Sequence, residues 1–198
     1  MMFSKISGAR LFALPLILSL GACVSFGGKA PASMLVLTAD NVMSAGTART
    51  ANAADALVIQ TPEVPRKLDT NRVPVQIDAS SIAYLKDAFW ADKPASLMQK
   101  LLVETVSAKS SNLVLNEVDA GGKATRFLSG SLLEFGIDAA TNEAVVVYDA
   151  VKIIRGRATE KRRFEARRPV TLVEAAPAGA ALNAAANDVA AQVADWVN

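Results

Sequence analysis

Few residues in this chain have side chains that could carry chemistry, and a single thiol stands out among them. Cys23 is the only cysteine in 198 residues, and histidine is absent. Without histidine, Ser–His–Asp and Cys–His catalysis and nearly all zinc-enzyme sites are excluded. Gly121, Gly122 and Lys123 lack the first glycine and the final hydroxyl of a phosphate loop. The sequence therefore predicts a protein that is not an enzyme and has no metal site or dissociable cofactor.

The residues before Cys23 have the order of an export signal. Two basic side chains come first, an apolar block follows over residues 11–18, and small residues precede the cysteine. This is the layout of a bacterial secretory signal peptide. The block is shorter than the roughly 20 apolar residues that a transmembrane helix needs, and Pro15 interrupts it. We expect residues 1–22 to be removed on export.

The four residues Leu20, Gly21, Ala22 and Cys23 resemble the lipobox of bacterial lipoproteins. The resemblance implies cleavage between Ala22 and Cys23, a diacylglycerol thioether on the thiol and an acyl chain on the freed amine. A thiolate is the nucleophile that accepts the lipid, and lipidation removes a free thiol from an oxidising compartment. An ordinary signal peptide with a chance cysteine is the alternative.

The lipid chains would hold the protein on a membrane, because two or three acyl chains bind far more firmly than one. Val24 follows the cysteine where many lipoproteins retained in the inner membrane have aspartate. By the same resemblance, we expect a lipid-anchored protein of the cell envelope that faces the periplasm, at the outer membrane.

The exported chain is predicted to be one neutral domain. Loss of residues 1–22 removes two basic and no acidic side chains, which leaves 19 basic against 19 acidic. A neutral chain argues against nucleic-acid binding. Residues 23–32 are interpreted as the lipidated N-terminus and a small-residue tether, and residues 33–198 as a single domain with one core.

Two amphipathic patterns predict helices. The first begins near Pro94, with Asp92 placed to cap it, and has its apolar stripe between residues 97 and 106. The second covers residues 177–197, with Asn187 expected to lie away from its apolar face. We interpret both stripes as core.

Apolar and alternating patterns predict the strands, and residues 40–55 lack such a pattern and are expected to form a loop. The fold class is therefore α/β (α+β): a single domain with a mixed, largely antiparallel sheet and two principal helices packed on it, with a three-layer sandwich as a variant. The predicted strand regions are 33–39, 56–65, 72–85 in two pieces, 112–117, 125–138, 143–154 and 162–173.

Residues 84–108, in which Trp90–Ala91 runs directly into the first helix, resemble the ABC-type transport auxiliary lipoproteins, the family of the paraquat-inducible lipoprotein C. The order of elements is similar over nearly the whole exported chain. The resemblance implies partnership with an ABC ATPase and permease and with an MCE-domain (mammalian-cell-entry) protein, which move lipids between envelope membranes. This chain would be their docking component, and a homo-oligomer is compatible with that role. The alternative is a stand-alone structural or assembly lipoprotein of the outer membrane.

Trp90 is interpreted as a core residue that joins the first helix to the sheet.

A basic stretch near the C-terminus is the candidate contact surface. It could bind anionic headgroups or an acidic partner, or it could be the solvated face of a hairpin. We favour the hairpin because Glu160 and Glu165 interrupt the run. The basic residues are Arg155, Arg157, Lys161, Arg162, Arg163, Arg167 and Arg168.

A periplasmic hydrolase remains a third interpretation. It would need a pair of carboxylates across a cleft. Glu63 with Asp69, or Glu160 with Glu165, are the candidate pairs, although solvated surface acids explain all four more simply.

Overall fold

The computed structural model describes residues 33–198. The lipobox, Cys23 and the rest of the predicted signal and tether lie outside the described residues. The predicted fold class is confirmed, because two helices and a seven-stranded mixed sheet form the described part of the chain. The elements are β1 Leu57–Ile59, the 3-10 turn η1 Arg66–Leu68, β2 Arg72–Gln76, β3 Ile82–Phe89, α1 Pro94–Lys109, β4 Val114–Leu115, β5 Arg126–Asp138, β6 Glu143–Ile154, β7 Glu160–Pro169 and α2 Ala175–Val197.

Strand β5 organises the sheet. One of its edges pairs along its whole length with β6, which in turn pairs with β7, and both pairings are antiparallel. Its other edge is shared by β1 at its beginning and β2 at its end, both parallel to it. β4 and β3 then flank β1 and β2. The strands predicted over residues 125–138, 143–154 and 162–173 correspond to β5, β6 and β7, and β7 is an edge strand.

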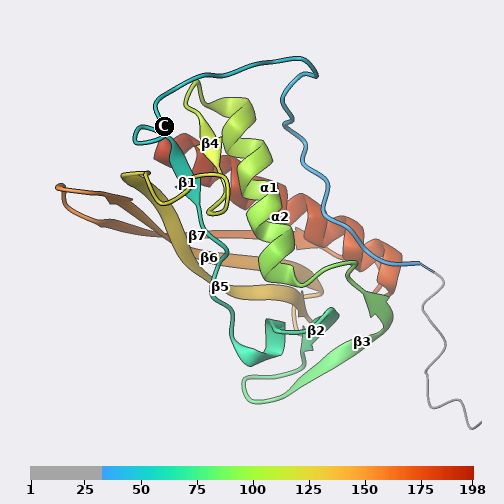
Figure 1. Ribbon diagram of the computed structural model, residues 1–198. Coiled ribbons are helices and arrows are strands. Elements are labelled where there is room, and N and C mark those ends of the chain that lie inside the picture. The colour runs from blue at the N-terminus through green and yellow to red at the C-terminus, as the bar shows by residue number, and fades with distance from the viewer. Residues whose placement is uncertain (1–32) are drawn as a thin grey trace, which may run out of the picture. The chain divides into compact units, whose positions relative to one another are not determined.

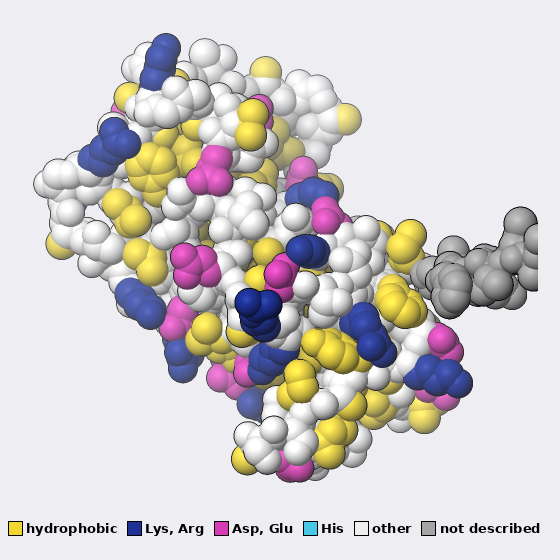
Figure 2. Space-filling view, turned by 60° about the horizontal axis from the view of Figure 1, so that its bottom comes forward, with side chains coloured by type: hydrophobic (Ala, Val, Ile, Leu, Met, Phe, Trp, Pro, Cys, Tyr) yellow, Lys and Arg dark blue, Asp and Glu magenta, His cyan; other side chains and the backbone are white. Residues whose placement is uncertain are grey.

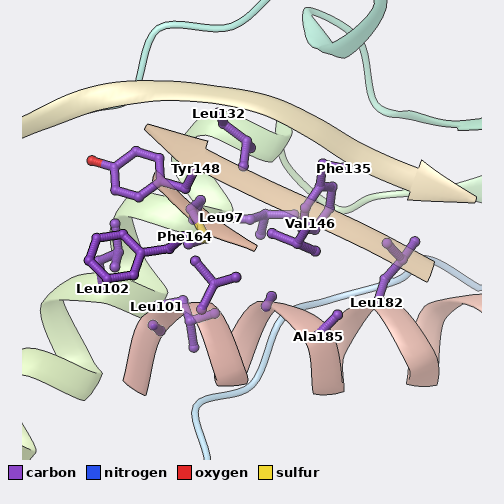
Figure 3. Close-up of a cluster of buried hydrophobic side chains, with 14 of the residues drawn as sticks. Leu97, Leu101, Leu102, Leu132, Phe135, Val146, Tyr148, Phe164, Leu182 and Ala185 are labelled. Atoms are coloured by element: carbon purple, nitrogen blue, oxygen red, sulfur yellow. The ribbon is translucent and has the colours of Figure 1, made fainter. Parts of the chain in front are cut away.

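Both helices lie on the same face of this sheet, so the domain has two layers and not three. α1 and α2 pack directly against each other, and α2 also contacts β6 and β7 (Figure 1). Figure 3 shows the core between the layers, with Leu101 and Leu102 of α1 and Leu182 of α2 facing Val146 and Tyr148 of the sheet. The apolar stripes of both helices are therefore core, as predicted.

Trp90 is fully buried and tilts against Phe135, with 5.1 Å between the ring centroids. This confirms the interpretation of Trp90 as a core residue. Small side chains of α2, such as Ala185 and Ala186, are also fully buried and let the helix backbone approach its neighbours closely.

The strand predicted over residues 33–39 is wrong. Leu35 forms one isolated bridge to Trp90, and the rest of the segment runs extended without pairing to another strand. Its apolar alternation is real, because Leu35 and Leu37 pack on the core while Met34 and Val36 are each 57% exposed. The segment packs on a helix where the pattern predicted a sheet partner.

Two predictions about the helices also need correction. The residue that precedes α1 is Lys93, and no side chain caps this end of the helix. Asp92 instead accepts a hydrogen bond from its neighbour's amide and pairs with Lys100. Asn187 is 5% exposed, although it was expected to lie away from the buried face. A second surface of α2 is therefore covered.

No helix within residues 33–198 is long and apolar enough to cross a membrane.

Candidate functional site

The predicted basic stretch is divided by the β6–β7 hairpin into three groups that face different surroundings. Side chains alternate along β7, so Lys161, Arg163 and Arg167 lie on the sheet face that carries no helix. Arg162 and Arg168 lie on the helix-covered side. Arg155 and Arg157 belong to the exposed turn at the tip of the hairpin.

On the open face, Asp149 pairs with two of the predicted residues. Its carboxylate accepts hydrogen bonds from Nε and a terminal nitrogen of Arg163 at 2.6 and 2.9 Å, and Lys161 lies 3.2 Å away. The Arg163 hydrogen bond lowers the pKa of Asp149 to about 2, against the opposing effect of burial. Asp149 is only 7% exposed, so this ionised carboxylate is a structural part of the sheet.

The remaining cations of β7 are also largely occupied. Arg167 lies at 2.8 Å from Glu165 and within 3.4 to 3.6 Å of Glu143 and Asp138. Arg168 pairs with Asp188 of α2 at 2.6 Å. Figure 2 shows one face of the molecule, on which basic and acidic side chains lie next to one another and do not gather by sign. Most of the predicted patch is therefore an internal network of ion pairs on an edge strand.

Arg155 and Arg157 differ, because neither has a carboxylate partner among residues 33–198. The fold places three more basic residues at this edge of the sheet, where β1 and β5 begin and β6 ends. They too have no ion pair within the described chain. We call the set Arg49, Lys123, Arg126, Arg155 and Arg157 the basic edge. Sequence reasoning missed its first three members because they are isolated along the chain.

Residues 33–40, here called the N-terminal strap, lie on α2. Asn183 accepts a hydrogen bond from the amide of Thr38 at 2.8 Å. Asn187 accepts one from the amide of Asp40 at 2.8 Å and donates to the carbonyl of Thr38 at 2.9 Å. Two asparagines one helical turn apart thus satisfy three backbone groups of the strap.

The start of the strap fits against both the sheet and the helix. The Leu35 amide donates to the Phe89 carbonyl at 2.7 Å, and the Leu35 carbonyl accepts from the Ala91 amide at 2.8 Å. A Cβ atom on Gly179 of α2 would lie only 2.6 Å from a methyl carbon of Leu35. Glycine at this position leaves room for the Leu35 side chain on the helix.

A groove of about 690 Å³ lies on the open face between the β2–β3 turn and β5, β6 and β7. Its charged walls are satisfied within the chain, because Lys67 pairs with Glu134 at 2.6 Å and Arg167 with its three acids. Asp78, also in the groove, has no ion pair among residues 33–198, but its carboxylate accepts hydrogen bonds from the amide and hydroxyl of Ser80, which lower its pKa, whereas a general acid needs a raised one.

The acid pairs proposed for a hydrolase are not assembled for catalysis. Glu160 and Glu165 lie on opposite faces of β7 and pair with Lys152 and Arg167. A hydrogen bond from Lys93 lowers the pKa of Asp69, whereas a general acid needs a raised pKa. No group of three or more potential metal ligands occurs within residues 33–198.

The structure thus defines a class of protein: a two-layer α/β domain whose N-terminal strap is fixed on its last helix. Residues 37–194 match the family model described as "ABC-type transport auxiliary lipoprotein component". The chain belongs to this family, and the resemblance seen in the sequence is confirmed. The family is one of auxiliary transport components.

Solved structures share the fold. Protein XCC0632 from Xanthomonas campestris superimposes with a TM-score of 0.67 at 17% identity, over 83% of this chain and 94% of that protein. An uncharacterised protein matches with a TM-score of 0.64 at 14% identity, over 84% of this chain and 100% of its own length. At such identities the likeness concerns the fold alone. No curated protein matches the sequence.

Proposed function

We propose that this chain is a non-catalytic lipoprotein of the periplasm, the auxiliary docking component of an ABC-type lipid transporter of the MCE system. The match to the auxiliary family over residues 37–194 carries the proposal. The site chemistry supports it, because most of the predicted basic patch is paired within the domain and Glu160 and Glu165 lie on opposite faces of β7 with a cation each. The partners would be an MCE-domain protein and an ABC permease with its ATPase.

Cys23 is the proposed membrane attachment. Cleavage after Ala22, a diacylglycerol group on the thiol and an N-acyl chain on the new N-terminus would anchor the domain to the periplasmic side of the outer membrane. The fold supports this arrangement, because the strap takes the chain onto the domain directly after a tether of ten residues, 23–32.

The test is a pull-down of the tagged, lipidated protein from its own cell envelope in mild detergent, with mass spectrometry of the recovered proteins. We expect an MCE-domain protein together with its permease. The matched control is Cys23→Ala, which keeps the domain and removes the lipid, and which should reduce recovery of the complex if anchoring contributes to assembly.

Recovery of a different outer-membrane machine, with no ABC component, would contradict the proposal and favour a stand-alone assembly lipoprotein. Intact-mass measurement of the mature protein tests the anchor separately. An unmodified Cys23, or cleavage at another residue, would overturn the lipid attachment without affecting the family assignment.

A further inference from the structure

We propose that the basic edge is the surface through which this domain binds an acidic polypeptide segment of its transporter partners. The inference rests on the proposed function for the identity of the partner. The surface itself is argued from the placement and pairing of its five cations, Arg49, Lys123, Arg126, Arg155 and Arg157.

Backbone hydrogen bonds bring these residues to one edge of the sheet. Arg126 is paired with Ile154 at the end of the β5–β6 ladder, and the next residue, Arg155, donates its amide to the Thr125 carbonyl at 2.9 Å. Lys123 lies two residues before Thr125, which in turn donates its amide to the Ala54 carbonyl at 3.1 Å. Segments near residues 54, 125 and 155 therefore converge.

Arg49 reaches the same edge from the side of β4, on the other side of β1 from β5. A terminal nitrogen of its guanidinium donates to the Asn112 carbonyl at 3.1 Å. The next residue along, Leu113, accepts a hydrogen bond from the Leu57 amide at the beginning of β1. Because Leu57 is also in register with Arg126, the backbone that binds the Arg49 guanidinium lies about two strand spacings from Arg126, or roughly 10 Å.

The charge of this edge is not cancelled from within. Half of the 18 lysines and arginines in residues 33–198 form ion pairs, whereas none of the five at the basic edge does. Three acids, Asp55, Asp119 and Glu160, lie nearby in the chain, and Glu160 is paired with Lys152, so a positive surplus remains. The adjoining strand β7 shows that this fold pairs its cations where their role is structural. Cations that have no ion pair at an exposed edge are available to bind an acidic partner protein.

The position of the edge favours a protein over the membrane that would hold the lipid. The strap reaches the domain at Leu35 beside Gly179, whereas the basic edge adjoins Val197, which lines a small pocket together with Arg126. The two points are separated by about 27 Å of helix at 1.5 Å per residue. Figure 1 shows these two points at opposite sides of the domain: the described chain enters at the right, and the β6–β7 hairpin projects at the left.

The strap keeps the point where the chain joins the domain at the opposite end from the basic edge. If it were free, the chain would first be held to the domain at Arg49, through its hydrogen bond to the Asn112 carbonyl, and the extended reach of residues 23–48 would span the whole domain. With the strap held by Asn183 and Asn187, the chain meets the domain beside Gly179, and only the ten residues 23–32 separate that point from Cys23. The basic edge lies at the opposite end of α2 from this attachment point and is open to the other components of the transporter.

A binding assay tests the chemistry. The mature, lipidated protein in nanodiscs of neutral phosphatidylcholine is titrated with a fluorescent polyglutamate peptide and, separately, with vesicles that contain phosphatidylglycerol. We expect salt-sensitive binding of the peptide, weakened roughly tenfold in the double variant Arg155→Glu/Arg157→Glu. The matched control Arg66→Glu/Lys86→Glu makes the same change of charge at exposed, unpaired residues elsewhere and should weaken binding by less than about twofold.

Equal losses in the two variants would overturn the proposal, because only net charge would then matter. Binding of the anionic vesicles in preference to the peptide would also overturn it and identify a lipid surface.

Cross-linking in the cell envelope tests the location. A photoreactive amino acid at Thr159, in the exposed turn of the β6–β7 hairpin, is expected to cross-link the MCE-domain protein or the permease. The same photoreactive amino acid at Ala79, in the exposed β2–β3 turn, is the control and should not cross-link either protein. Cross-links from Ala79 alone, in cells where the pull-down recovers the complex, would overturn the docking surface and leave the proposed function intact. Failure of the pull-down would contradict the function, and the polyglutamate assay would still decide the chemistry of the basic edge.

Discussion

The two faces of the β5–β6–β7 sheet are made by the same strands and stabilised in different ways. On the covered face, Val146 and Tyr148 are fully buried under the helices. On the open face, Asp149 is held between Lys161 and Arg163, and no helix covers the strands. Successive residues of one strand, such as Tyr148 and Asp149 of β6, thus belong in turn to an apolar core and to a network of ion pairs. The comparison shows that a charged strand can be structural, so a basic sequence run need not be a binding site.

The largest effect should come from the covered face. Phe135→Ala removes a fully buried ring that packs on Trp90, and it should lower the free energy of unfolding by about 3–5 kcal/mol. Urea denaturation followed by circular dichroism measures this change. Lys161→Ala, an exposed substitution on the open face, is the control and should cost less than about 1 kcal/mol. Equal losses would mean that the two faces are not distinct in energy.

On the open face, the largest effect is expected at Asp149. Asp149→Asn removes the charge that holds Arg163 and Lys161, and should cost about 1–2 kcal/mol, since the partners are solvent-exposed and screened. The same denaturation assay checks it at low and high salt. A stability equal to that of the unsubstituted protein would show that the ion pairs on this face do not contribute to the free energy of unfolding.

The pH dependence of the same pair sharpens this test. The pKa of Asp149 lies at about 2 in the folded chain, below the ordinary value of 3.8, so the unfolded chain binds the proton more readily. The stability that it contributes is fully present above about pH 4 and is lost as the pH falls toward 2. The difference between the unsubstituted protein and Asp149→Asn should therefore be constant from pH 7 to 5 and shrink below pH 4. A constant difference at all pH values would contradict the assignment.

A third surface, the outer side of α2, is sealed by the strap. Asn187→Ala removes two hydrogen bonds to the strap and should cost about 1–2 kcal/mol. It should also make residues 33–55 more sensitive to limited proteolysis, which mass spectrometry of the fragments would show. Gln192→Ala, an exposed change on the same helix, is the control. Unchanged proteolysis in Asn187→Ala would mean that other contacts hold the strap.

The smallest effect on stability is expected at the basic edge. Arg155→Glu/Arg157→Glu changes two exposed residues without ion pairs among residues 33–198, so its unfolding free energy should stay within about 0.5 kcal/mol of the original. Thermal denaturation checks this directly. A large loss would reassign these residues to the structural network of β7.

Much of the fold could be predicted from local patterns. The β6 strand was placed at its observed limits, 143–154, and both helices were found from their apolar stripes. The strap was misassigned because alternation in residues 33–39 is the same for a segment that packs on a helix as for a strand. The pattern places Asn187 on the surface because nothing local shows that a distant segment covers α2.

The sequence by itself determined the fold class, the family and the prediction of a lipid attachment at Cys23, since each depends on residue types and spacing within short stretches. Only the tertiary structure decided which cations are neutralised and which are left at the basic edge. The reason is physical: ion pairing depends on distances of a few ångströms between side chains that are far apart in the chain. Asp149 and Arg163 meet through strand register, and Lys123 and Arg155 converge through the β5–β6 ladder.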